Sequence, residues 1–243
     1  MSPRPLSVSW AYVQTMLHKF PNTPSLTLAR AFDESMFNPF GLPETDEVEY
    51  IPFILPKRCK RILYLSDIHI PYHNIGALTC ALQFGLDRKA DTIFLGGDFL
   101  DFYSLSSFEK DPRKRNFKEE LETGKEVLSI IRAQFPKAKI YYLIGNHEER
   151  FERYMRVKAP ELLDFDEFRI DKLLDFKTHR IELISGKRVT KAGKLNLVHG
   201  HEFGRGGASS SVNPARGLYN RAKTSTICGH HHQTSEHNER DLN

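Results

Sequence analysis

Three short apolar runs in this chain end abruptly in polar residues or glycine, and a helical pattern separates each run from the next. The runs cover residues 60–65, 91–95 and 139–144. Runs of this length are typical of buried strands. Apolar residues recur at helical spacing between 75 and 86, and again between 117 and 135 behind Asn116, which resembles a helix start. Alternating strands and helices predict a parallel sheet covered by helices.

The second half of the chain is richer in strands. Residues 148–176 show a helical pattern with an interruption near Pro160. Further strands are then expected at 180–185, 188–190, 195–198 and 225–228, with a turn at Ala192 and Gly193 and a possible partner strand at 235–240. The pattern therefore predicts an α/β fold in which two sheets pack together with helices outside.

The first 56 residues differ from the rest and are expected to form a separate extension, with the main domain at 57–243. Ser9 and Ser25 are placed to cap two short helices, and prolines from Pro39 to Pro56 indicate a linker. Two short helices with a tight break resemble a helix-turn-helix. This segment has a net charge of −3, which argues against strong DNA binding and favours packing or oligomerisation.

Composition excludes several classes of protein. Hydrophobic residues make up 40% of the chain and charged residues 27%, as in ordinary globular proteins. No apolar run is long enough to span a bilayer, and residues 1–10 lack the apolar core of a secretory signal. The three cysteines are widely spaced, which favours reduced thiols and a cytoplasmic protein. The chain ends soon after residue 232, so it is either compact or a shortened form.

The net charge of +4 is unevenly distributed. Residues 57–243 carry +7, and this part also holds the polar residues that follow the strands. A basic surface suits a polyanionic substrate, although a solvated basic surface explains the charge equally well.

Five segments place metal-binding residue types where strands are expected to end. They are Asp67-Ile-His69, Gly97-Asp98, Gly145-Asn146-His147-Glu148, His199-Gly-His201 and Gly229-His-His-His232. Sites in open α/β sheets gather beyond the carboxyl ends of strands. A bridging carboxylate with imidazoles and oxygens suits two metal ions about 3.5–4 Å apart, which clamp a phosphate during in-line displacement. Each motif alone has an ordinary explanation, such as a helix cap, a turn or a surface cluster, but their joint order is hard to explain by chance.

In this order the motifs resemble the calcineurin-like metallophosphoesterase superfamily over residues 61–232. The resemblance implies a four-layer αββα sandwich and a centre of two divalent metal ions, with Mn²⁺ favoured and Fe, Zn²⁺ or Ni²⁺ as alternatives. Residues 20–29 also resemble a leader of phage-encoded members. A phage-encoded protein would work in the host cytoplasm.

The resemblance also implies roles for individual residues. Asp98 would bridge the metals and His147 would lie beside the scissile phosphate, while Asp101 would orient a ligand histidine. The remaining expected ligands are Asp67, His69 and His232 for one ion, and Asn146, His199 and His230 for the other. For the fourth motif His199 is preferred over His201, because it directly follows the apolar strand.

The expected reaction is hydrolysis of a phosphate ester by metal-activated water. Asp101 is followed by Phe102-Tyr103, whereas protein serine/threonine phosphatases have Arg-Gly after their aspartate. This favours a phosphodiesterase acting on DNA, RNA or a nucleotide, with Arg113, Arg115 and Arg150 as candidate substrate contacts. A phosphomonoesterase and a metal-bound binding module with vestigial catalysis are the alternatives. No basic strip interleaved with aromatic residues is visible in the sequence.

Overall fold

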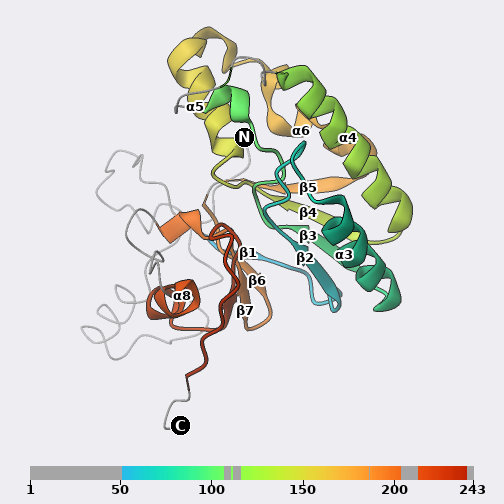
Figure 1. Ribbon diagram of the computed structural model, residues 1–243, viewed down its shortest axis with the longest axis vertical. Helices are drawn as coiled ribbons and strands as arrows, with labels where there is room; N and C mark the ends of the chain where they lie inside the picture. Colours follow the sequence, from blue (N-terminus) through green and yellow to red (C-terminus); the bar gives the residue numbers. More distant parts are fainter. Residues whose placement is uncertain (1–50, 107–110, 112–115, 186, 204–212, 240–243) are drawn as a thin grey trace, which may run out of the picture. The chain divides into compact units, whose positions relative to one another are not determined.

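The computed structural model describes residues 51–106, 111, 116–185, 187–203 and 213–239 (Figure 1). The two helices expected between residues 9 and 36 lie outside this range. Among the described helices, none has the length and apolar character that crossing a bilayer requires.

The first sheet consists of four parallel strands in the order β2-β3-β4-β5. Their bounds are Ile62–Leu65 for β2, Thr92–Leu95 for β3, Lys139–Leu143 for β4 and Ile181–Ile184 for β5. Helix α3 (Ile75–Asp87) connects β2 to β3, and α4 (Phe117–Gln134) connects β3 to β4. The Asn116 side chain caps α4 by accepting the Glu119 backbone N–H at 3.0 Å. The predicted strands, helices and helix start are confirmed.

Alternate residues of this sheet face two different cores. Leu63, Ile93 and Ile140 pack on the helix side with Leu128 of α4. Phe94 and Tyr141 face the other way, toward the second sheet. Because side chains alternate along a strand, a sheet buried on both faces is apolar at every position. This explains the continuous apolar runs in the sequence.

The second sheet has the order β1-β6-β7-β8. Its strands are short: Phe53–Ile54 for β1, Thr190–Ala192 for β6, Leu195–Leu197 for β7 and Thr226–Ile227 for β8. Strands β6 and β7 form an antiparallel hairpin, and its turn uses Gly193 at φ +63°. Leu197 packs against the first sheet, while Leu218 of helix α8 (Pro214–Ala222) packs with Val198 on the outer side. The four-layer αββα arrangement is thus confirmed (Figure 1).

Several short helical elements connect β4 to β5. They are α5 (Glu148–Lys158), η4 (Pro160–Leu162), η5 (Asp166–Phe168), α6 (Ile170–Leu173) and α7 (Phe176–His179). The break near Pro160 is confirmed, because α5 ends at Lys158 and Pro160 starts a new turn.

The structure differs from the sequence prediction at four places. The strand expected at 188–190 is β6 at Thr190–Ala192, so Ala192 belongs to the strand and not to the turn. Residues 235–239 form no strand, and the Ser235 hydroxyl instead accepts the Ala215 N–H at the start of α8. Helix α8 itself was not predicted. Strand β1 pairs with β6 although it falls within the first 56 residues, which were assigned to the extension. The proposed division of the chain at residue 56 otherwise stays a prediction.

Candidate metal centre

All five motifs lie just beyond the carboxyl ends of strands. Strands β2, β3 and β4 lead to the first three motifs, while β7 and β8 of the second sheet lead to the last two. The backbone continues the β2–β3 pairing past the strand ends, since Asp67 N–H donates to Gly97 O at 3.1 Å and His69 N–H to Asp98 O at 3.0 Å. The first two motifs are therefore held side by side.

Left-handed backbone conformations concentrate in these loops. Asp67, His69, Asp98, His230 and His232 all have φ between 50° and 71°. This conformation costs a residue other than glycine on the order of 1 kcal/mol, and such strain persists mainly where function requires it. Five of the seven expected ligands thus adopt strained backbone conformations that bring their side chains to one place.

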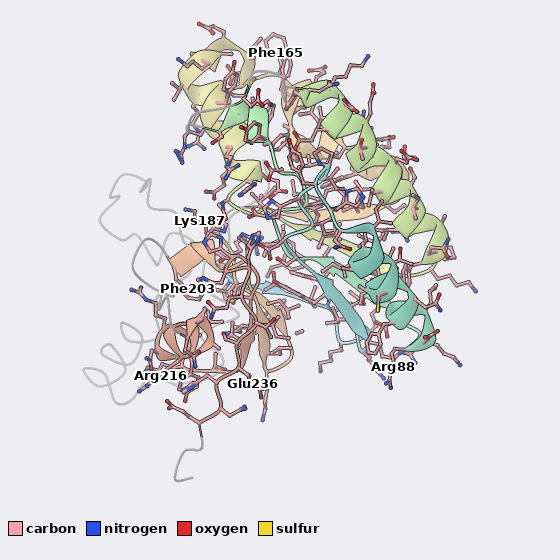
Figure 2. All side chains as sticks on the ribbon, in the orientation of Figure 1. Arg88, Phe165, Lys187, Phe203, Arg216 and Glu236 are labelled. Atoms are coloured by element: carbon pink, nitrogen blue, oxygen red, sulfur yellow. The ribbon has the colours of Figure 1, made fainter. Side chains whose placement is uncertain are left out.

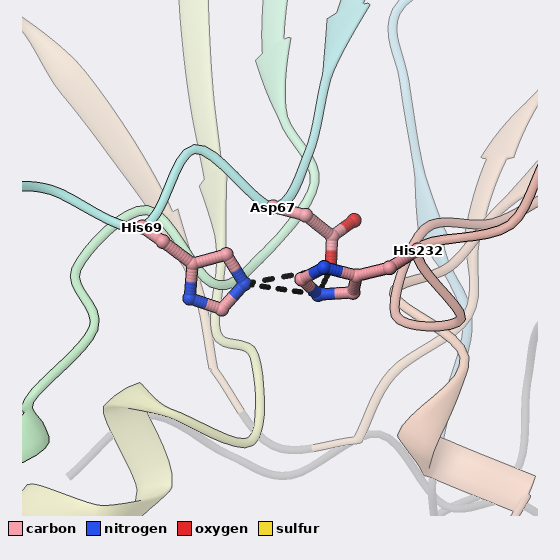
Figure 3. A group of neighbouring side chains, drawn as sticks. All are labelled: Asp67, His69 and His232. Atoms are coloured by element: carbon pink, nitrogen blue, oxygen red, sulfur yellow. Dashed lines mark hydrogen bonds and ion pairs between the residues drawn. The ribbon is translucent and has the colours of Figure 1, made fainter. Parts of the chain in front are cut away.

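One group of candidate ligands consists of Asp67, His69 and His232 (Figure 3). The Nε2 atoms of the two histidines lie 3.1 Å apart, and His232 Nε2 lies 3.4 Å from Asp67 Oδ1. The Asp67 carboxylate also accepts the His230 backbone N–H at 2.9 Å. This bond fixes the end of the second sheet against the end of the first.

A second group consists of Asp98, His199 and His230. Asp98 is 1% exposed and His199 is fully buried. His199 Nε2 lies 3.2 Å from Asp98 Oδ2 and 3.0 Å from Asn146 Oδ1. A third group combines the same Asp98 with His69 and His147, so Asp98 lies between the two sets of ligands.

The donor chemistry of both groups fits bound cations. His199 Nδ1 donates to Gly96 O at 2.9 Å, so in the neutral ring Nε2 carries only a lone pair. That lone pair faces a carboxylate oxygen and an amide oxygen, which are both acceptors. His69 repeats the arrangement, because its Nδ1 donates to Asp101 Oδ2 at 3.0 Å while its Nε2 faces His232 Nε2. Converging acceptors repel one another unless a cation lies between them.

Where no metal ion is bound, a proton on His199 relieves this repulsion, so a proton and a metal ion compete for the same place. Burial opposes protonation of His199, but the hydrogen bond and negative charge of Asp98 outweigh it and raise the pKa of His199. For Asp98, burial opposes ionisation, and the neighbouring histidines outweigh it and lower the pKa of its carboxyl. Burial and the charge of His199 lower the pKa of His230 to about 4. His230 is therefore a neutral imidazole at neutral pH, the form that binds metals.

His147, Asp101 and Arg150 form a connected unit at the rim of the two groups. His147 Nδ1 donates to the backbone oxygen of Asp101 at 2.8 Å, which leaves Nε2 facing outward. Arg150 donates to that Nε2 at 2.7 Å and to the Asp101 oxygen at 3.1 Å. His147 Nε2 is also 3.7 Å from Asp98 Oδ2. The imidazole is thus held next to both candidate ligand groups.

Sequence reasoning gave Glu148 no role, yet it organises the site. Its buried carboxylate accepts the backbone N–H groups of four residues and the Tyr142 hydroxyl at 2.8–3.1 Å; the four are Asp98, Phe99, Leu100 and Gly145. Burial and the charge of Asp98 raise the pKa of Glu148, while the surrounding donors favour its ionised form. One carboxylate therefore ties the loop after β3 to the loop after β4. The sequence did contain a signal for this role of Glu148: it is the first residue of a helix that directly follows a buried strand.

The structure separates the neighbouring histidines of the fourth motif. His199 points into the ligand groups, whereas His201 Nε2 lies 3.1 Å from Glu149 and belongs to none of them. Glu202 accepts the His199 backbone N–H at 2.7 Å and so fixes the turn. His231 also lies outside the three groups.

Gly145 and Gly229 stand where neighbouring groups approach the backbone too closely for a side chain. A Cβ on Gly145 would collide with the backbone N and carboxylate of Asp98, and one on Gly229 would collide with the side chains of Asp67 and Ser66. Glycine at both positions therefore lets the neighbouring loops approach each other closely.

Of the candidate substrate contacts, the structure describes only Arg150. Arg113 and Arg115 lie outside the described residues.

Comparison with known proteins agrees with the geometry of the site. The chain is 28% identical over 179 residues to the Gene 54 protein of Mycobacterium phage D29, which covers 72% of this chain and 69% of that protein. It is 27% identical over 180 residues to the Gene 54 protein of Mycobacterium phage L5, with the same coverage. No solved structure matches the chain. The model of the calcineurin-like phosphoesterase family matches residues 60–239, so this chain belongs to that family of metal-dependent phosphoesterases.

Proposed function

We propose that the centre binds two divalent ions, most readily Mn²⁺, with Fe, Zn²⁺ or Ni²⁺ as alternatives. Asp98, which belongs to two of the candidate ligand groups, would be the ligand shared by both ions. Asp67, His69 and His232 complete one site, and Asn146, His199 and His230 complete the other. The observation that supports this assignment most directly is the convergence of the His199 ring nitrogen, the Asn146 amide oxygen and the buried Asp98 carboxylate on one place.

The ions, when bound, supply hydroxide near neutral pH and neutralise charge on the phosphoryl oxygens. Protein side chains perform the remaining steps. Asp101 orients His69 through the 3.0 Å contact to Nδ1. His147 Nε2 lies at the rim and accepts from Arg150; when Arg150 turns to the phosphate and the ring is protonated, Nε2 donates a proton to the leaving oxygen or stabilises charge on the phosphoryl group. Arg150, beside it, binds a nonbridging phosphate oxygen.

For the substrate we propose a phosphodiester of a nucleic acid or nucleotide. Phe102 and Tyr103 follow Asp101, in place of the Arg-Gly of protein phosphatases. Arg150 provides a cation at the centre, and Arg113 and Arg115 of the chain between β3 and α4 are proposed as further contacts. The phage relatives favour an enzyme that acts in the host cytoplasm.

The test compares wild-type protein with Asp98→Ala and with the control Asp87→Ala, an exposed aspartate on α3. The substrates are bis-p-nitrophenyl phosphate and p-nitrophenyl phosphate, with Mn²⁺ added. We expect hydrolysis of the diester to exceed that of the monoester. Asp98→Ala should nearly abolish turnover and lower metal content, and Asp87→Ala should change neither. Normal turnover by Asp98→Ala refutes the centre, and a strong preference for the monoester identifies a phosphomonoesterase.

A further inference from the structure

A cleft of about 690 Å³ opens along α5. The side chains of Arg153 and Arg156 on α5 line one part of it, η5 and α6 line another, and Lys187 after β5 lines a third. Its volume lies within the range of small-ligand sites. Figure 2 labels two lining residues, Phe165 near the top of the view and Lys187 close to its centre.

One end of the cleft adjoins the candidate metal centre through Glu149, which contacts His201 beside the ligand His199. Helix α5 begins at Glu148, directly after His147, and its first-turn residue Glu149 lines the cleft. Glu149 also contacts His201 at 3.1 Å and Lys187 at 3.7 Å. Because an ester at the metal centre lies at the start of α5, a substrate larger than the ester itself extends naturally along this helix.

Two exposed aromatic rings line the cleft. Phe165 is 54% exposed and Phe168 is 37% exposed. The rings meet edge to face, with centroids 6.5 Å apart. Exposed phenylalanine side chains in a cleft offer flat apolar surface to a planar ligand. The lining also includes the apolar side chains of Ile144 and Met155.

Cations line the same cleft, and most of them pair with acidic residues that also line it. Arg156 pairs with Glu152, Arg169 pairs with Asp171, and Lys187 pairs with Glu149. Arg153 also lines the cleft and has no ion-pair partner among the residues that the structure describes. Aromatic rings combined with arginine are the surface that single-stranded nucleic acids use, since bases stack on the rings and phosphates bind the cations.

We propose that this cleft is the nucleoside subsite of the enzyme: a base of the substrate stacks on the face of one of the two rings, Phe165 and Phe168, and meets the edge of the other, while Arg153 binds the adjoining phosphate. The proposal rests on the proposed phosphodiesterase function and names the substrate class as a nucleotide or single-stranded nucleic acid. A phosphopeptide offers the same phosphate but no obligatory planar ring, so the aromatic pair favours the nucleotide.

The test uses two esters with the same leaving group, thymidine 5′-(p-nitrophenyl phosphate) and methyl p-nitrophenyl phosphate, with the Mn²⁺-loaded full chain. The measured quantity is the ratio of kcat/KM for the nucleotide ester to kcat/KM for the methyl ester. Alanine replacement of an aromatic residue that stacks on a base lowers binding by about fivefold or more. We therefore expect the Phe165→Ala/Phe168→Ala double variant to lower this ratio by at least about fivefold. The control is Phe84→Ala on α3, where the side chain is 55% exposed and lies outside the cleft.

The possible outcomes test the nucleoside subsite independently of the metal centre. A wild-type ratio near one, or a double variant with the wild-type ratio, overturns the subsite while hydrolysis of the methyl ester still supports the metal centre. An equal loss in the double variant and in Phe84→Ala also overturns it. Hydrolysis of a phosphopeptide that depends on both rings, without such dependence for the nucleotide ester, assigns the cleft to peptide. A wild-type protein that hydrolyses neither ester refutes the proposed function together with the subsite.

Discussion

Replacing Glu148 with glutamine tests how the loops around the metal centre are held. Oε1 of this glutamate accepts Phe99 N–H, Leu100 N–H and the Tyr142 hydroxyl, while Oε2 accepts Asp98 N–H and Gly145 N–H. A glutamine side chain has one acceptor oxygen and one NH₂ donor. In either orientation at least two of these hydrogen bonds are lost, and the NH₂ group then faces other donors.

The magnitude follows from these lost bonds. Hydrogen bonds to a charged group contribute about 1.5 kcal/mol or more each, so two of them amount to about 3 kcal/mol. Because Glu148 is 4% exposed, water cannot replace the lost acceptor. For a domain of this size we expect the melting temperature to fall by roughly 6–12 °C. Metal affinity should fall as well, since the Asp98 backbone is one of the groups released.

Urea unfolding of purified Glu148→Gln measures the loss of folding stability, and metal analysis measures the loss of bound metal. Glu152→Gln on the same helix is the matched control, because its exposed ion pair with Arg156 contributes at most about 1 kcal/mol. The reasoning fails if Glu148→Gln unfolds at the same urea concentration as Glu152→Gln and retains its full metal content.

Three further predictions follow from the structure. Burial raises the pKa of Glu120 to about 7 from an ordinary 4.5, so its ionisation destabilises the fold increasingly as pH rises from about 4.5 to 7. Glu120→Gln should therefore be more stable than wild type by up to about 3 kcal/mol at pH 8 and by much less at pH 5, measured by urea unfolding at both pH values. Elemental analysis should show less bound metal in Gly145→Ala, because the added methyl group displaces Asp98. Gly76→Ala is the control, since its position on a helix has room for a methyl group and its metal content should not change. Full metal occupancy in Gly145→Ala would contradict this prediction. Chelation should lower the melting temperature of the Mn²⁺-loaded protein by about 5–10 °C if free Mn²⁺ was about 100 times its Kd, and an unchanged value after complete chelation would argue against metal binding in the native state.

Much of the fold could be predicted from local pattern. The apolar runs that became β2, β3 and β4 are buried on both faces, and this double burial is what makes them continuous in sequence. The cap at Asn116 was visible because capping depends on residues only three positions apart. Helix α8 was missed, since its apolar contact through Leu218 is limited to a few residues near Val198.

The sequence by itself determined which residue types stand at the strand ends, and therefore which chemistry the chain supports. That information is local, because a strand, its terminating glycine and the following ligand are adjacent in the chain. Only the tertiary structure decided which role each of these residues has. It placed Asp98 between two ligand groups, turned His199 inward and His201 toward Glu149, and set Glu148 beneath two loops. It also brought Phe165, which precedes η5, and Arg153 of α5 into one cleft, although the two residues are not adjacent in the chain. These outcomes depend on side-chain direction and on pairing between distant segments, and neither is encoded in any short stretch of the chain.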